Sequence, residues 1–264
     1  MNDAEPLLRL RGIGKNFGPV HALTNINLEI PAGQVTALVG DNGAGKSTLI
    51  KTIAGIWEPN GGEIIWLGRP VHFRSPKDAT AAGIATVYQD LALADNLDIV
   101  QNMMLGHELR IYGLLDEISM EQTAKQTLAD LRVTTVRNIR QPVGSLSGGQ
   151  RQAIAVAKAV MLDARLVIMD EPTAALGVSQ TELVLEIIKR LSSRGIAVLL
   201  ISHNLTDVFA VADRVAVLYL GRLVSSGPVS GYDTNSTVHW MTTGSAPGTR
   251  SGTPQPTVPG NTGD

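Results

Sequence analysis

The stretch Gly40-Asp41-Asn42-Gly43-Ala44-Gly45-Lys46-Ser47 follows the apolar run 35–39 and matches the phosphate-binding pattern G-x-x-x-x-G-K-[ST]. Glycines let such a loop turn tightly, so that successive backbone N–H groups converge on phosphate oxygens, and a helix that begins near Gly45 adds the positive end of its dipole. Lys46 can reach the β and γ phosphates, and Ser47 can ligate Mg²⁺. We therefore predict a nucleoside triphosphate site over residues 40–48, which includes Thr48. A glycine-rich turn that carries Lys and Ser by coincidence would leave the strand–loop–helix context unexplained.

Composition narrows the class of protein. The chain has 264 residues, of which 44% are apolar and 17% are charged, and this is enough for a buried core. Its net charge of −2 offers no general basic surface, so we expect no nucleic-acid partner. Cysteine is absent, which excludes disulfides and thiolate metal sites. The acidic start at residues 1–6 does not resemble a signal peptide, and the apolar runs are too short to cross a bilayer, so any membrane role must act through a partner.

The order of apolar runs predicts an α/β fold. Residues 7–17 and 22–30 have the pattern of strands and predict an antiparallel sheet at the N-terminus. Further strand-like runs alternate with helical stretches, which is typical of a parallel sheet with crossover helices. These runs lie at residues 35–39, 84–88, 165–169, 196–201 and 214–219.

Two regions depart from this alternation. Helical spacing recurs at residues 97–112, 120–132 and 147–162, so we predict a helical subdomain over about 90–163, inserted into the core. Residues 244–264 are rich in Gly, Pro, Thr and Ser and cannot offset the entropy cost of ordering. We expect one folded domain over residues 1–243, followed by a disordered tail.

Two acidic residues end the apolar run 166–171. The carboxyl ends of strands are where α/β folds bind ligands, so Asp170 and Glu171 are expected in the binding crevice. Asp170 is suited to holding Mg²⁺, usually through water, and Glu171 to accepting the proton of an attacking water. Consecutive strand residues point in opposite directions, and the turn that begins at Pro172 complicates that rule, so the pair need not share a task. The alternative is a pair of solvated acids.

A second glycine-containing loop, Leu146-Ser147-Gly148-Gly149-Gln150, precedes a helical run. A serine and two glycines at a helix start form another anion cradle, or an N-cap with a flexible lead-in. One triphosphate does not need two cradles. The second cradle therefore requires its own explanation.

Taken together, these motifs resemble the ATP-binding subunits of ABC transporters over roughly residues 7–230. The loop at 40–47 is similar to the family's Walker A, the run 166–171 to its Walker B and catalytic glutamate, and Leu146–Gln150 to its LSGGQ signature. Gln89 resembles the Q-loop glutamine and His203 the switch histidine. Phe17 stands where the family places an aromatic that stacks on adenine.

The resemblance implies a P-loop ATPase core with an N-terminal antiparallel β subdomain and an inserted helical subdomain. It implies catalytic roles for Lys46, Gln89, Glu171 and His203, and Mg²⁺ ligation by Ser47, Gln89 and Asp170. ATP would contact Phe17 and residues 40–48 of one subunit. It would contact the partner subunit at Ser147, Gly148, Gly149 and Gln150. Two copies would thus pair head to tail, which explains the second cradle.

Within the family, the chain looks like the single-cassette ATPases of bacterial monosaccharide importers of the ribose, xylose and fructose kind. The resemblance implies a homodimer beneath two transmembrane permease subunits, with residues just past Gln89 forming the docking groove, and a sugar-binding protein as an indirect partner. The subunit would lie at the cytoplasmic face of the inner membrane as a peripheral protein. The alternatives are an ABC ATPase for another substrate and a soluble ABC ATPase without a transport role. One departure is Gly177, which stands where the family commonly has an aspartate that crosses the dimer interface.

Overall fold

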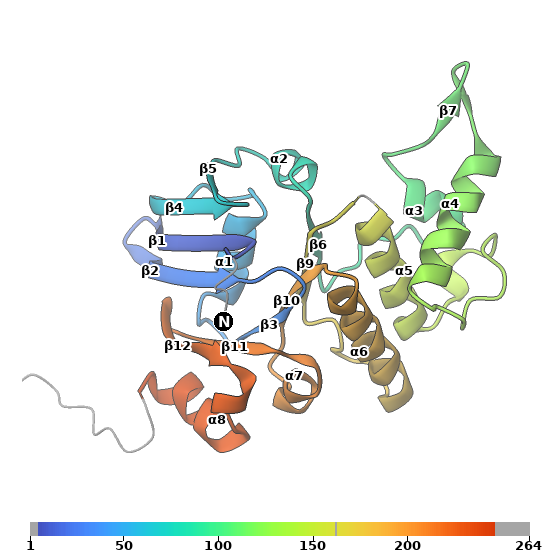
Figure 1. The fold of residues 1–264 in the computed structure, drawn as a ribbon. Helices are drawn as coiled ribbons and strands as arrows, with labels where there is room; N and C mark the ends of the chain where they lie inside the picture. The colour runs from blue at the N-terminus through green and yellow to red at the C-terminus, as the bar shows by residue number, and fades with distance from the viewer. Residues whose placement is uncertain (1–4, 162, 246–264) are drawn as a thin grey trace, which may run out of the picture.

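The computed structural model describes residues 5–161 and 163–245. An antiparallel sheet at the N-terminal end has the strand order β2-β1-β4-β5 (Figure 1). Its strands are β1 (Leu8–Phe17), β2 (Val20–Ile30), β4 (Gly61–Trp66) and β5 (Arg69–Val71). Apolar residues of β1 and β2 face each other, as in the pairs Leu8–Ile30 and Leu10–Leu28. The predicted N-terminal sheet is therefore present, with β4 and β5 as additional strands.

The second sheet has the order β12-β11-β3-β10-β9-β6. Its strands are β3 (Val35–Val39), β6 (Ile84–Val87), β9 (Leu166–Asp170), β10 (Ala197–Ile201), β11 (Arg214–Tyr219) and β12 (Arg222–Pro228). All pairs are parallel except β11–β12, which is antiparallel. The five predicted runs are thus five parallel strands. The predicted phosphate loop leaves the carboxyl end of β3, in the interior of the sheet.

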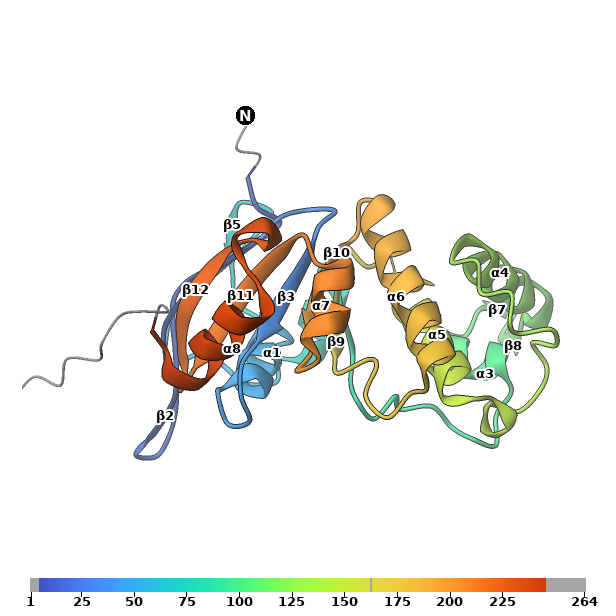
Figure 2. The ribbon, with the colours of Figure 1, turned by 90° about the horizontal axis from the view of Figure 1, so that it is seen from below.

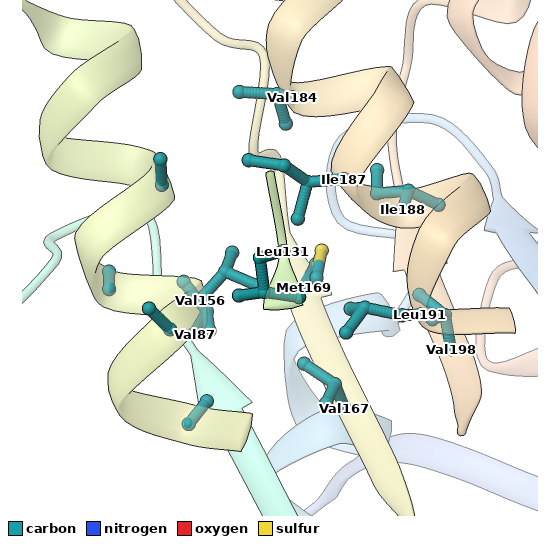
Figure 3. Close-up of a cluster of buried hydrophobic side chains, with 14 of the residues drawn as sticks. Val87, Leu131, Val156, Val167, Met169, Val184, Ile187, Ile188, Leu191 and Val198 are labelled. Carbon is teal, nitrogen blue, oxygen red and sulfur yellow. The ribbon is translucent and has the colours of Figure 1, made fainter. Parts of the chain in front are cut away.

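Alternate residues of the central strands face two different layers, because side chains along a strand point to opposite faces. Val167 and Met169 of β9 pack against α5 (Gly148–Met161) and α6 (Val178–Ser193), as Figure 3 shows. Ile168 of the same strand packs on the other side, against α1 (Lys46–Ile53) and the N-terminal sheet. Burial on both faces explains why these strands are continuously apolar.

The region between β6 and β9 contains α3 (Ile99–Met104), α4 (Glu117–Asp130), the 3-10 turn η1 (Val143–Ser145) and α5. The prediction of helix over 97–112 was wrong in its second half. Asp98 caps the start of α3, and the backbone turns at Gly106, whose φ of 84° is incompatible with a right-handed helix. A small hairpin follows, with β7 (Arg110–Ile111) and β8 (Leu114–Leu115). The subdomain limits of about 90 and 163 stay a prediction.

The remaining helices are α2 (Pro76–Ala81), α7 (Leu205–Val211), the 3-10 turn η2 (Val229–Gly231) and α8 (Thr234–Thr243). The view in Figure 2 shows α7 and α8 beside β11 and β12, at the opposite end of the molecule from α4. Gly244 ends α8 in the left-handed conformation. The predicted disordered tail, beyond Ser245, lies outside the described residues. Among the helices of the described part, none has the length and apolarity needed to cross a membrane.

Candidate nucleotide site

A cavity of about 540 Å³ lies at the carboxyl ends of β3 and β9, beside the start of α1. It brings together residues that are far apart in the sequence, including most of the predicted phosphate loop, Gln89 and both acids. Its lining residues are Val20, His21, Ala22, Asn42, Gly43, Ala44, Gly45, Lys46, Ser47, Thr48, Gln89, Asp170, Glu171, Leu220 and Gly221. Gly40 and Asp41 lie just behind this surface, at the base of the loop.

Two N–H groups of the loop donate to Asp41, that of Ala44 to its carbonyl oxygen at 3.1 Å and that of Asn42 to its carboxylate at 2.7 Å. Gly43 and Gly45 have φ values of 79° and 104°, which side-chain-bearing residues rarely adopt. Gly45 is the N-cap of α1, and among the described residues no side chain caps this helix. The first N–H groups of α1 therefore remain free to bind an anion. Close packing also requires glycine here, since a Cβ on Gly45 would approach the carbonyl oxygen of Ala22 to 2.8 Å.

Lys46 supplies the positive charge of the cavity. Its Nζ donates to the carbonyl oxygens of Gly40 at 2.7 Å and Asp41 at 3.0 Å, so the side chain folds back over its own loop. Burial lowers the pKa of Lys46, while Glu171, Asp41 and Asp170 act in the opposite direction. These contacts hold an ammonium group next to the N-terminus of α1, where phosphate oxygens would lie.

The two acids share the cavity although they are adjacent in sequence. Asp170 is the last residue of β9, paired with Ile201 of β10. Glu171 has already left the strand, because its φ is 51°, a value that costs energy for a residue other than glycine. Its N–H donates to the carbonyl of Ile201 at 2.9 Å. This turn removes the alternation that would send the two carboxylates to opposite faces, and it resolves the ambiguity left by the sequence.

Burial raises the pKa of Asp170, and the neighbouring Glu171 carboxylate adds to this effect. Lys46 and Lys51 oppose it and lower the pKa. A bound cation would favour the ionised form of this carboxyl.

His203 joins the site through Glu171. It follows β10, and its Nδ1 lies 2.8 Å from Glu171 Oε2, while its backbone N–H donates to the same oxygen at 3.4 Å. The imidazole is largely exposed and does not itself line the cavity. Behind this pair, the Thr173 hydroxyl donates to the buried Asp207 at 2.7 Å and links the turn after Glu171 to α7. No sequence motif predicts this second contact.

Phe17 lies beside the cavity rather than in its lining. Its ring makes an edge-on contact with Trp57, with the centroids 4.7 Å apart, and it remains 41% exposed. Cross-strand pairing sets it next to Val20, which does line the cavity. The half-exposed ring is thus available at the rim to a flat ligand.

The lining also contains residues that the sequence analysis missed. His21 and Ala22 come from β2, and Leu220 and Gly221 from the turn between β11 and β12. His21 is oriented by a 2.8 Å hydrogen bond between its Nδ1 and Asn16 Oδ1. No motif marks these positions, because only the topology of the two sheets brings them to the phosphate loop.

Residues 147–150 do not contribute to this cavity. They start α5, where the Gln150 N–H donates to Ser147 Oγ at 3.3 Å and the Gln150 side chain accepts from the Ser147 N–H at 3.0 Å. This is a capping arrangement, as the N-cap interpretation predicted. Both glycines also allow close packing, since a Cβ on Gly148 would lie 2.9 Å from Leu176 and one on Gly149 would lie 2.8 Å from Gln180. Within one chain, the two cradles are therefore separate.

Comparison with known proteins identifies the family. The family model described as ABC transporter matches residues 23–174, more than half of the chain. The chain belongs to the ABC transporter family. It is 46% identical to the fructose import ATP-binding protein FrcA of Rhizobium meliloti, over 90% of this chain and 94% of that protein. It is 45% identical to the xylose/arabinose import ATP-binding protein XylG of Sulfolobus acidocaldarius, over 83% and 86% of the two chains.

The lengths of the relatives differ. The ribose import ATP-binding protein RbsA of a Jannaschia species is 43% identical over 90% of this chain, but the match covers 46% of that protein. The chain thus spans about half of this relative and nearly all of FrcA. This agrees with the prediction that it resembles the single-cassette members.

Solved structures agree on the fold. MJ1267, an ATP-binding cassette of an ABC transporter in its ADP conformation, matches with a TM-score of 0.79 and 25% identity, covering 89% of this chain and 96% of that one. The cassette MJ0796, in a dimeric post-hydrolysis structure with ADP and phosphate, matches with a TM-score of 0.70 and 23% identity, covering 85% and 100%. The predicted α/β P-loop ABC ATPase fold is confirmed. The chain is an ABC-type ATPase, a component of a membrane transporter.

Proposed function

We propose that this ATPase hydrolyses ATP in the cavity at the start of α1 and thereby energises import of a monosaccharide. The observation that carries the proposal is the convergence of Lys46, Asp170, Glu171 and Gln89 on one cavity, with His203 bonded to Glu171. The triphosphate would lie against the N–H groups of residues 43–48, with Lys46 between its β and γ phosphates. Adenine would stack on Phe17 at the rim.

The donor set of the cavity fits Mg²⁺. Ser47, Gln89 and Asp170 offer oxygen atoms on one surface, and hard divalent cations prefer oxygen ligands. The described residues contain no cluster of three or more His, Cys, Asp or Glu side chains suited to a metal. Mg²⁺ is usually held by one or two carboxylates together with substrate phosphates, so the ion would be shared with phosphate oxygens. When bound, it would neutralise charge on the β and γ phosphates.

Glu171 is the proposed general base. Its carboxylate lines the cavity and can accept the proton of the attacking water. The His203 imidazole is hydrogen-bonded to one oxygen of this carboxylate and would fix the orientation of Glu171. It would also contact the γ phosphate. The backbone at Glu171 is strained, and strain of this kind accumulates where a side chain must be aimed at a reacting group.

We further propose that the site is completed by a second copy of the chain. Ser147, Gly148 and the start of α5 do not line the cavity of their own subunit, yet they form a glycine-containing helix N-terminus of the kind that binds phosphate. In a head-to-tail dimer, each signature loop would cover the γ phosphate held by the other copy. ATP binding would close the dimer, and hydrolysis would weaken it.

The substrate assignment comes from the relatives, whose names specify import of fructose, xylose or arabinose, and ribose. We propose two permease subunits as direct partners, a sugar-binding protein as an indirect partner, and a position at the cytoplasmic face of the cell membrane. Import of another solute is the alternative. Reconstitution with co-purified membrane subunits should yield ATPase activity that fructose, xylose or ribose stimulates. Stimulation by a different solute would correct the substrate and leave the ATPase assignment intact.

The catalytic assignment is tested with Glu171→Gln. This variant should bind ATP normally, lose about 100-fold or more of its hydrolysis rate, and accumulate ATP-dependent dimers on size-exclusion chromatography. Chelation of divalent cations should abolish hydrolysis by the unmodified chain. Unchanged turnover in Glu171→Gln would contradict the role given to this carboxylate.

A further inference from the structure

The hairpin between α3 and α4 is the most exposed apolar feature of the described chain. Seven of the fourteen large hydrophobic side chains that are exposed in this part of the protein fall within residues 105–118. We call residues 109–115 the apolar hairpin. Strands β7 and β8 pair Arg110 with Leu115 and Ile111 with Leu114, and the Asp116 N–H donates to the Leu109 carbonyl at its base. Such a concentration of apolar surface marks a contact site.

Both faces of the apolar hairpin remain exposed in the described part of the chain. Residues paired across two strands share a face, so Ile111 and Leu114 occupy one side and Leu115 the other. Leu114 is 75% exposed, and both Ile111 and Leu115 are more than half exposed. Figure 1 shows the hairpin projecting beyond α3 and α4, on the side of the molecule where α2 lies and away from α8. It is a convex wedge rather than a groove.

The turn of the hairpin presents an aromatic residue at its tip. Tyr112 and Gly113 both have positive φ, at 52° and 84°, the pattern of a tight hairpin turn that normally favours Asn-Gly. A tyrosine in this conformation is strained, and its side chain is fully exposed. Neither packing within the chain nor turn preference accounts for it. A contact outside the chain would account for it.

The distribution of charged residues in the hairpin indicates what kind of surface it contacts. Residues 111–115 carry no charge, and the nearest charged residue in the hairpin is Arg110, while Asp116 and Glu117 lie at the base. An uncharged apolar tip, a tyrosine with its polar hydroxyl, and an arginine just behind them match the boundary between acyl chains and phosphate headgroups. A protein partner would need a deep groove that encloses both faces of the wedge. A bilayer interface deforms around it.

We propose that the apolar hairpin inserts into the interfacial layer of a lipid bilayer, with Arg110 at the level of the lipid phosphates. The inference rests on membership of a membrane-transporter family, which holds the chain close to a bilayer, and not on the roles proposed in the nucleotide site. A few side chains give weak binding on their own, so the contact would orient an assembled subunit rather than recruit a free one.

Site-specific labelling tests the proposal, because the chain has no cysteine of its own. Tyr112→Cys would carry an environment-sensitive fluorophore, and Val238→Cys on α8, which is also an exposed apolar position, would be the matched control. Each labelled protein would be assembled with its co-purified membrane subunits, reconstituted in vesicles of phosphatidylcholine alone or with added phosphatidylglycerol. The label at position 112 should shift its emission to the blue, lose several-fold of its quenching by aqueous iodide, and gain quenching by lipids brominated on their acyl chains. The label at position 238 should show none of these changes.

Leu114→Asp in the Tyr112→Cys background should abolish the shift by placing a carboxylate in the wedge, and thermal unfolding would verify that this variant is folded. ATP hydrolysis measured in the same samples should be unaffected, so that a failure of the nucleotide site is separable from a failure of the lipid contact. Equal responses of the two labels to vesicles would overturn the proposal. So would a blue shift at position 112 without any quenching by brominated lipids, since the hairpin would then dock on protein.

Discussion

Two helices of this protein begin in loops that contain glycines, and the two starts differ in what satisfies their backbone donors. At α1, among the described residues, no side chain caps the helix, and its first N–H groups face a cavity beside Lys46. At α5, Ser147 and Gln150 cap the helix reciprocally, and its start lies outside that cavity. The glycines also have different roles. Gly43 allows a positive φ, and Gly149 allows tight packing on α6.

The difference indicates which cradle holds the triphosphate on its own. The start of α1 offers free donors, a lysine and two nearby carboxylates, so it can bind a charged phosphate chain without help. The start of α5 already has internal hydrogen bonds, and its Arg151 is paired with Asp95 at 3.2 Å, so it is less suited to hold a triphosphate on its own. This asymmetry supports the proposed composite site between two copies.

Replacement of Lys46 should produce the largest effect and would test the α1 side of the comparison. Lys46→Ala removes the ammonium group that lies beside the loop carbonyls, so ATP binding should be lost and hydrolysis should fall by at least about 100-fold. Titration with a fluorescent ATP analogue measures the binding. Lys51→Ala, five positions further along α1, should bind ATP as the unmodified chain does. Tight binding by Lys46→Ala would contradict the assignment of this cradle.

Replacement of Ser147 tests the α5 side. Ser147→Arg should leave ATP binding to the same subunit intact, because residue 147 is outside its cavity, and should reduce turnover by about 100-fold by spoiling the partner's cradle. Ser145→Arg, two residues earlier on an exposed turn, is the matched control. Steady-state hydrolysis and analogue titration separate the two effects. Normal hydrolysis by Ser147→Arg would remove the signature loop from the reaction.

Sequence alone predicted the parts of this site that are encoded locally. The loop at 40–47 and the acids after β9 lie in short segments whose conformation follows from glycines and an apolar strand. His21, Leu220 and Gly221 were missed, because they reach the cavity only through strand order in two sheets. The helix predicted over 97–112 is present only as α3, because the apolar residues of the hairpin also fit helical spacing and the turn at Gly106 ends the helix early.

Replacement of Gly149 should have a smaller effect, and this effect is on stability. It tests why α5 needs a glycine at this position. A Cβ at this position would lie 2.8 Å from Gln180 Cβ, so Gly149→Ala should force α5 and α6 apart and cost about 1–3 kcal/mol of unfolding free energy. Gly177→Ala is the control, since its φ is −75° and nothing lies within 4 Å of the added methyl group. Urea denaturation measures both. Equal stability of the two variants would mean that the tight packing does not require Gly149.

Replacement of Asp170 should have the smallest effect on the nucleotide-free protein, and its sign depends on pH. Burial raises the pKa of this carboxyl above its ordinary value of 3.8, so the folded chain holds the proton more tightly than the unfolded chain. Ionisation therefore costs stability as pH rises from the ordinary value through the raised one. Asp170→Asn removes that cost and should raise Tm by roughly 1–3 °C at neutral pH, without nucleotide or Mg²⁺. The gain should vanish below pH 3.8, and a gain that persists there would have another origin.

Mixing two inactive variants tests the shared site most directly. Lys46→Ala lacks a working α1 cradle and Ser147→Arg lacks a working α5 cradle, so each alone should be inactive. A mixed dimer would contain one site with Lys46 from one copy and Ser147 from the other, and random pairing should restore up to about a quarter of the original ATPase activity. A mixture as inactive as its components, with mixed dimers present, would contradict a site built from two chains.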